Sequence, residues 1–132
     1  MIAPAQVALA DAPVVTAPDG STVHVLCRLA GGSMARFSLK AGQVALAVRH
    51  RTVDEIWYVV SGRGEMWRSG PEGATTIALM PGLSMTIPVG CGFQFRAAAD
   101  SDLAAVAITM PPWPGEGEVE PVAGPWEPTV SV

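Results

Sequence analysis

Turn-forming residues recur along this chain at intervals that are mostly eight to twelve positions long, and this spacing limits the fold more than any other feature. The segments between the turns are rich in β-branched, aromatic or alternating residues, and Gly or Pro interrupts every longer helical period. The turns are Asp19-Gly20, Gly31-Gly32, Ala41-Gly42, Ser61-Gly62, Gly70-Pro71, Pro81-Gly82 and Pro88-Val89-Gly90. The expected strands are residues 23–29, 36–39, 44–49, 55–60, 75–79, 85–87, 93–96 and 103–110. The sequence therefore predicts an all-β sandwich or barrel.

The length of the chain fits one domain. Its 132 residues, 49% of them apolar and 15% charged, are enough for one substantial core. In a double-sheet jelly roll one sheet folds over the other, and a small ligand can bind between them. We expect such a barrel over residues 1–110.

The composition changes after residue 110. Half of the twelve prolines lie in residues 111–132, together with four glutamates, so regular structure is not expected there. Trp113 and Trp126 also lie in this segment, and large aromatic rings bury much area when they dock. We therefore interpret residues 111–132 as an extended arm packed on its own barrel or on that of a neighbour. The alternative is a flexible tail in which both tryptophans are incidental.

Charge and hydropathy exclude several partners. Twelve acidic and eight basic residues give a net charge of −4, and the basic residues are scattered, so nucleic acid is not an expected partner. No apolar run approaches the roughly 18 residues of a membrane helix. The N-terminal segment has no basic leader and is interrupted by Pro4 and Asp11, unlike a signal peptide. We expect a cytoplasmic protein with Cys27 and Cys91 reduced.

Two spaced motifs carry a resemblance to a known family. His50, Glu55 and Gly62 have the spacing of the first cupin motif, and Gly82, Pro88 and Gly90 follow the second. The chain resembles a small single-domain cupin over residues 42–97. This resemblance implies a double-stranded β-helix, or jelly-roll barrel.

The resemblance also implies a divalent metal, such as Fe, Mn, Ni or Zn, held by three His and one Glu. Only His50 and Glu55 match those ligands here, because Val48 and Phe93 occupy the other two His positions and Ala97 replaces a family Asn. The metal-binding motif is therefore degenerate. Other side chains able to complete a site are those of His24, Cys91 and Gln94.

Strand alternation predicts how the motif residues face. If His50 points inward, Val48 and Leu46 point inward as well, while Arg49 and Ala47 face outward. Glu55, Trp57 and Val59 share one face, and so do Phe93 and Phe95. The short turn at residues 51–54 should join two strands as a hairpin and bring His50 beside Glu55.

An imidazole beside a carboxylate in an apolar cavity suggests acid–base chemistry. Burial disfavours the charged carboxylate and the imidazole favours it, and such opposed effects place pKa values near neutrality. We therefore expect His50 and Glu55 to act as general acid and base on a small apolar or aromatic substrate, in an isomerase, lyase or cyclase without a complete metal site. The expected ligand-binding residues are Val48, Trp57, Met85, Phe93, Phe95 and Arg36, the last as a possible anion ligand.

Three alternatives remain. One is a metal-dependent dioxygenase or sugar-type isomerase, in which His50, Glu55 and non-standard ligands hold the metal. Another is a barrel that binds a small ligand without catalysis. In the third, His50 and Glu55 form only a structural ion pair.

The expected assembly is a homodimer. Ile56, Tyr58 and Val60 face away from His50 by strand alternation, which suggests packing against a second sheet or a partner. Met66 and Trp67 are read as core or interface residues. Exposed sheet edges and an aromatic arm are common where such barrels pair.

Overall fold

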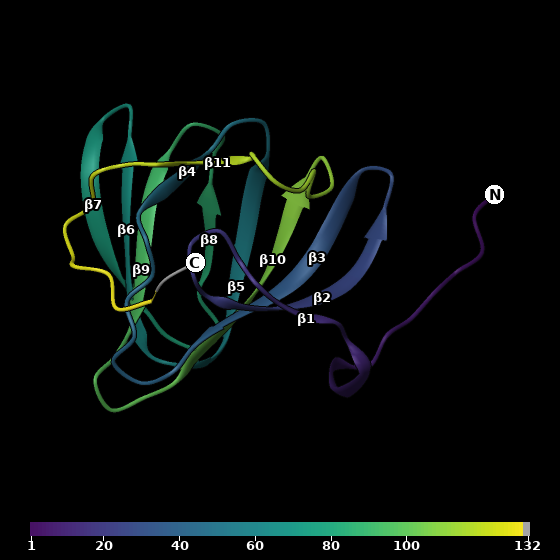
Figure 1. The fold of residues 1–132 in the computed structure, drawn as a ribbon, viewed down its shortest axis with the longest axis horizontal. Coiled ribbons are helices and arrows are strands. Elements are labelled where there is room, and N and C mark those ends of the chain that lie inside the picture. The colour runs from purple at the N-terminus through teal and green to yellow at the C-terminus, as the bar shows by residue number, and fades with distance from the viewer. Residues whose placement is uncertain (131–132) are drawn as a thin grey trace.

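The computed structural model describes residues 1–130, and strands dominate it (Figure 1). They form two sheets in which every pairing is antiparallel. The six-stranded sheet has the order β1 (Val14–Thr16), β2 (Thr22–Leu29), β3 (Gly32–Leu39), β10 (Leu103–Met110), β5 (Asp54–Gly62) and β8 (Ser84–Ile87). The five-stranded sheet has the order β11 (Val119–Pro121), β4 (Val48–His50), β9 (Gly92–Ala97), β6 (Gly64–Gly70) and β7 (Gly73–Leu79). The all-β jelly-roll prediction is confirmed.

Helix is nearly absent from the described residues. The one helical element of residues 1–130 is the short 3-10 turn η1 (Leu9–Asp11), close to an N-terminal segment that extends away from the barrel (Figure 1). No helix in this part of the chain has the length and apolar character needed to cross a bilayer. Cys27 and Cys91 are not joined in a disulfide.

Most expected strands form, and the differences have a tertiary cause. β6 was not expected, because Glu65, Arg68 and its terminal glycines give it a weak strand pattern, but it is paired on both sides by β7 and β9. The strand expected at residues 44–49 is reduced to β4, with one isolated bridge at Val44. Residues 44–47 instead bond to a loop and to the arm: Leu46 N–H donates to Asp19 C=O at 2.8 Å.

The core lies between the two sheets. Along β5, Glu55, Trp57 and Val59 are buried while the intervening side chains are exposed, which confirms the predicted alternation. Trp57 stacks on Phe37 at 5.2 Å between ring centroids and meets Phe95 edge-on at 5.0 Å. These rings make the barrel interior apolar around the motif residues.

The glycine that ends the first motif is required by its surroundings. Gly62 has a φ of +80°, where L side chains are strained. A Cβ at this position would lie 1.7 Å from the backbone oxygen of Asp102. The motif glycine thus permits a close approach between the end of β5 and the start of β10.

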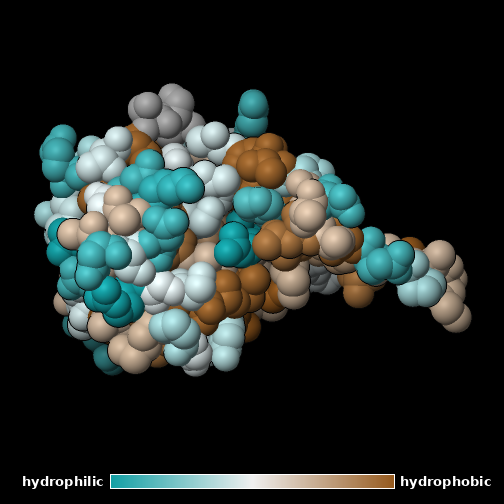
Figure 2. All heavy atoms as spheres, turned by 90° about the horizontal axis from the view of Figure 1, so that it is seen from below, coloured by the Kyte–Doolittle hydropathy of each residue, from teal (hydrophilic) through white to brown (hydrophobic). Residues whose placement is uncertain are grey.

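The outer face of β5 remains uncovered in the single chain. Ile56, Tyr58 and Val60 are 43%, 50% and 41% exposed, so no second sheet covers them. Figure 2 shows hydrophobic side chains gathered on the face seen from below, beside the projecting N-terminal segment.

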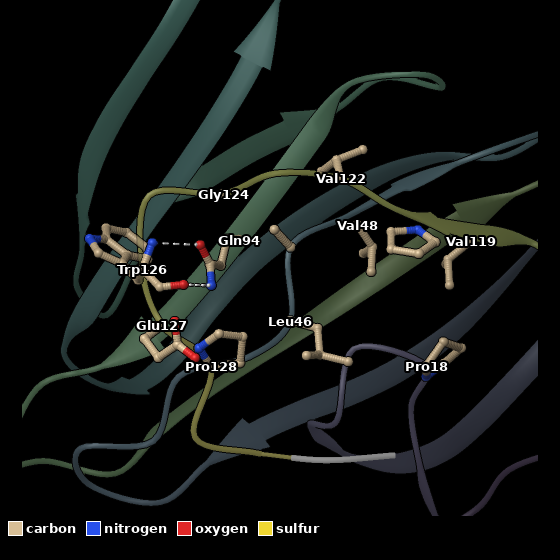
Figure 3. A pocket seen from close by; sticks show the side chains of 12 residues that line it. Pro18, Leu46, Val48, Gln94, Val119, Val122, Gly124, Trp126, Glu127 and Pro128 are labelled. Atoms are coloured by element: carbon tan, nitrogen blue, oxygen red, sulfur yellow. Dashed lines mark hydrogen bonds between the residues drawn. The ribbon is translucent and has the colours of Figure 1, made fainter.

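The C-terminal arm lies along its own barrel as far as residue 130; the last two residues of the expected arm are outside the described range. Regular structure was not expected here, but β11 forms because β4 offers it an open edge. The Gln94 side chain bonds to both backbone groups of Trp126, donating to its C=O and accepting from its N–H (Figure 3). The arm also covers Ala47, which was expected to face solvent and is buried, with its C=O bonded to Val122 N–H at 3.0 Å.

Candidate functional site

His50 ends β4 with its ring inside the barrel. Only 4% of it is exposed. Its ring packs on Phe93, with 5.3 Å between centroids, and meets Trp113 of the arm edge-on at 5.7 Å. Its Nδ1 atom is buried and has no hydrogen-bond partner. The imidazole is therefore held by aromatic rings on two sides, with one unpaired nitrogen.

Glu55 faces His50 from the opposite sheet. Its Oε1 contacts His50 Nε2, and its Oε2 accepts a 3.0 Å hydrogen bond from Trp57 Nε1. The expected hairpin is wrong: β4 and β5 belong to different sheets, so residues 51–53 cross between the layers. The pair therefore meets across the barrel interior.

A second carboxylate, Glu118, reaches His50 from the arm. Its Oε2 lies 3.5 Å from His50 Nδ1 and accepts from the backbone N–H groups of Thr52 at 3.0 Å and Val53 at 3.2 Å. The Thr52 hydroxyl donates to its other oxygen. Burial acts to raise the pKa of Glu118, but these hydrogen bonds and His50 together lower it below its ordinary value. A carboxylate thus lies near each ring nitrogen: Glu55 contacts Nε2, and Glu118 lies 3.5 Å from Nδ1 without a hydrogen bond to it.

Sequence reasoning missed Glu118 because it is one of several glutamates in a proline-rich segment. No motif marks it, and its partners lie 65 and 66 positions earlier in the chain. The pairing of β11 with β4, which sets Val119 opposite His50, brings it to the site.

A third buried carboxyl group, on Asp19, also acts on this site. Its Oδ1 accepts hydrogen bonds from the Ser21 N–H at 3.0 Å and the Ser21 hydroxyl at 2.6 Å. Burial raises the pKa of Asp19; the Ser21 bonds oppose this, Glu55 adds to it, and His50 opposes it more weakly. The Asp19-Gly20 pair was read from the sequence only as a turn.

Five of the six expected ligand-binding residues lie inside the barrel. They are buried in one apolar cluster: Val48, Trp57, Met85, Phe93 and Phe95. Met85 pairs with Trp57 across β8 and β5, and Val48 pairs with Phe93.

Arg36 does not belong to this group, and the expectation for it is wrong. Its neighbour Phe37 points inward onto Trp57, so strand alternation places Arg36 on the opposite face of β3. There it lies opposite His24 of β2. A one-residue shift in the assumed facing of this strand explains the error.

A hollow on the surface lies under the arm. It has a volume of about 340 Å³ (Figure 3). It is lined by Pro18, Leu46, Ala47, Val48, Gln94, Val119, Pro121, Val122, Gly124, Trp126, Glu127 and Pro128. Neither His50 nor Glu55 lines it, although Val119 pairs with His50 and Val48 lies two residues before His50. The site is therefore a closed interior next to a hollow beneath the arm.

The residues around His50 do not fit the metal site that the cupin resemblance implies. Val48 and Phe93, at the two other ligand positions, are register partners and present only carbon atoms to the site. Glu55 lies at Nε2 of the ring and Glu118 at Nδ1. A metal ion bound to either nitrogen could therefore not be bound by both carboxylates as well.

Two of the three other proposed donors also fail to complete it. Gln94 is engaged by the arm, and His24 shares the outer face with Arg36. Within residues 1–130, no group of three or more His, Cys, Asp or Glu side chains is placed to hold a metal ion.

Comparison with known proteins supports the fold. A family model described as a cupin domain matches residues 35–109. KdgF from Halomonas sp. is 17% identical, with a TM-score of 0.70, over 83% of this chain and 94% of that one. A Streptomyces Pac13 variant solved with uridine is 15% identical, with a TM-score of 0.71, over 92% of each chain. Pac13 is described as a nucleoside dehydratase.

A variant of oxalate decarboxylase from Bacillus subtilis is 12% identical, with a TM-score of 0.77. The alignment covers 92% of this chain but only 33% of that one. No curated protein matches the sequence. At these identities the structural similarities establish the fold and not the reaction.

Proposed function

This chain belongs to the cupin domain family, and from that premise we propose that it is a small-molecule enzyme in which His50 and Glu55 act as general acid and base. The observation that carries the proposal is the contact between His50 Nε2 and Glu55, both buried, beside the apolar core. Such an environment strengthens electrostatic interactions and lets one proton be shared between the two groups.

The proposed chemistry is proton transfer of the isomerase, lyase or cyclase kind. In a dehydration, the base removes a proton from carbon while the acid protonates the departing hydroxyl group, so that a double bond forms and water leaves. Trp57 holds Glu55 through its indole N–H and limits the carboxylate to one orientation. A fixed carboxylate beside a fixed imidazole meets the positional demand of such a step.

The proposed substrate is a small molecule with a planar ring. Phe93 packs on His50, Trp57 bonds to Glu55 and Phe95 meets Trp57 edge-on, and aromatic rings favour stacked or edge-on contact with other rings. Pac13 was solved with uridine and is described as a nucleoside dehydratase, and dehydration is a lyase reaction. Nucleosides are therefore the first compounds to test.

The test is product analysis with and without the imidazole. We expect the protein to convert a member of a nucleoside panel that includes uridine, with loss or rearrangement of atoms detected by mass spectrometry. His50→Gln should lower kcat/KM at least about 100-fold, because a positioned acid or base contributes about that much or more. His24→Gln, the same substitution on the outer face, should keep the wild-type rate.

An unchanged rate in His50→Gln would refute the acid–base role. Metal analysis of protein purified without chelator provides a separate check. A stoichiometric metal whose removal abolishes turnover would instead support a metal-dependent cupin enzyme with non-standard ligands.

We also propose that the protein is a homodimer. Ile56, Tyr58 and Val60 form an apolar stripe on the exposed face of β5, and Met34 on β3 of the same sheet is 39% exposed. Apolar surface of this kind is often covered by a partner in solution.

A further inference from the structure

We propose that Glu118 is a positioning residue, which fixes the tautomer of His50 by holding the imidazole proton on Nδ1. This role rests on the proposed function of His50 and Glu55. The juxtaposition that supports it is the buried Nδ1 atom without a hydrogen bond and the Glu118 carboxylate 3.5 Å away.

The Glu118 carboxylate is preorganised as an acceptor. Three donors from Thr52 and Val53 hold it, and only 3% of the residue is exposed. Those same bonds keep it ionised, because they favour the charged form over the neutral acid. An ionised carboxylate accepts but cannot donate, so it favours a proton on the ring nitrogen that faces it.

The consequence for His50 concerns its other nitrogen. A neutral imidazole carries one proton, so a proton held on Nδ1 leaves Nε2 as the basic atom. Nε2 is the nitrogen that contacts Glu55. The proton that takes part in the proposed acid–base step is then the one exchanged between Nε2 and Glu55.

Without Glu118 the opposite tautomer is expected. Glu55 is the remaining carboxylate in contact with the ring, and it would draw the proton to Nε2. Nε2 would then be unable to act as a base. A residue of the arm therefore sets the chemical state of a residue in the barrel.

The test reads the tautomer directly. In protein labelled with 15N-histidine, two-bond 1H–15N spectra distinguish protonated from unprotonated ring nitrogens. The chain has two histidines, so His24→Gln assigns the His50 signals. At neutral pH the wild-type protein should carry the proton on Nδ1, and Glu118→Ala should lose it from that atom.

Glu120→Ala is the matched control. Glu120 is two residues further along the arm but pairs with Arg49 and Arg51, not with His50. It should retain the wild-type tautomer. Thr52→Val controls for loosening of the arm, because it removes one bond to Glu118 while leaving the carboxylate in place.

An unprotonated Nδ1 in the wild-type protein would overturn the proposal, without need of any variant. An unchanged tautomer in a folded Glu118→Ala protein would do so as well. With a substrate in hand, Glu118→Ala should lower kcat at least about tenfold. The spectrum does not depend on turnover, so a missing activity refutes the proposed function and leaves the tautomer assignment standing.

Discussion

At the scale of single residues, one imidazole lies among buried carboxyl groups, two of which, on Glu118 and Asp19, have pKa values shifted in opposite directions. Glu118 has a lowered pKa because backbone and hydroxyl donors surround it. Asp19 has a raised pKa, because burial dominates over its two bonds to Ser21. Environments that separate the pKa values of neighbouring acids are a common feature of sites that move protons.

The raised pKa of Asp19 predicts a pH-dependent cost in stability. A folded-state pKa above the ordinary value of 3.8 means that the neutral acid is the favoured form in the native protein. The stabilising contribution is present below the unfolded pKa and is lost as pH rises through the folded pKa. Asp19→Asn keeps an oxygen for Ser21 and cannot ionise. Its advantage in free energy of unfolding over wild type should grow between about pH 4 and pH 7.

Urea unfolding at a series of pH values measures this difference. The charges of Glu55 and His50 act on Asp19 in both proteins, so the test is the difference between the two stability curves and not the shape of either one. Asp11→Asn, at an exposed acid, should run parallel to wild type. Parallel curves for Asp19→Asn would contradict the prediction.

At the scale of elements, the arm is part of the site and not an appendage. It contributes Trp113 to one side of His50, Glu118 to Nδ1, and β11 to the edge of β4. Its far end is fastened by Gln94 and by Trp126, whose ring lies 4.0 Å from the guanidinium carbon of Arg96. Because residues of the arm cover His50, the contacts that hold the arm on the barrel affect access to the site.

Gln94 should control how firmly the arm is held. Its amide donates to Ala45 C=O at 2.9 Å and Trp126 C=O at 2.8 Å, and accepts from Trp126 N–H at 3.1 Å. Gln94→Leu leaves these groups unpaired, at a cost of about 1–3 kcal/mol in the free energy that keeps the arm docked. Hydrogen exchange of the Trp126 amide should accelerate accordingly.

The same substitution at an exposed glutamine, Gln6→Leu, should leave that amide protected as in wild type. If exchange at Trp126 is equally slow in Gln94→Leu, the arm is held by other contacts and the inferred role of Gln94 is wrong.

At the scale of the whole molecule, the exposed stripe on β5 predicts a dimer. The wild-type protein should have twice the 13.7 kDa mass of the chain in light scattering. Val60→Asp places a charge in an apolar interface and should yield the monomer mass. Val89→Asp, at a similarly exposed valine in the turn after β8, should remain dimeric. A wild-type monomer would refute the proposed assembly.

The sequence by itself determined the class of fold and the facing of most strands. Turn residues act locally, through the φ they permit, and alternation is a property of any extended chain. Turns and strand alternation can therefore be predicted without knowing which strands pair with one another. The same reasoning placed His50, Glu55 and Trp57 inside. The cupin resemblance, and not the strand pattern, marked Val48 and Phe93 as replacements of metal ligands.

Only the tertiary structure decided how the two sheets bring distant groups together. Residues 51–53 cross between the two sheets where a hairpin was expected, and Arg36 faces outward. β6 forms because β7 and β9 pair with it on both sides. The tertiary structure also delivered Glu118 and Asp19 to the site. Their burial and hydrogen bonds depend on segments far away in the chain, and neither composition nor local pattern contains that information.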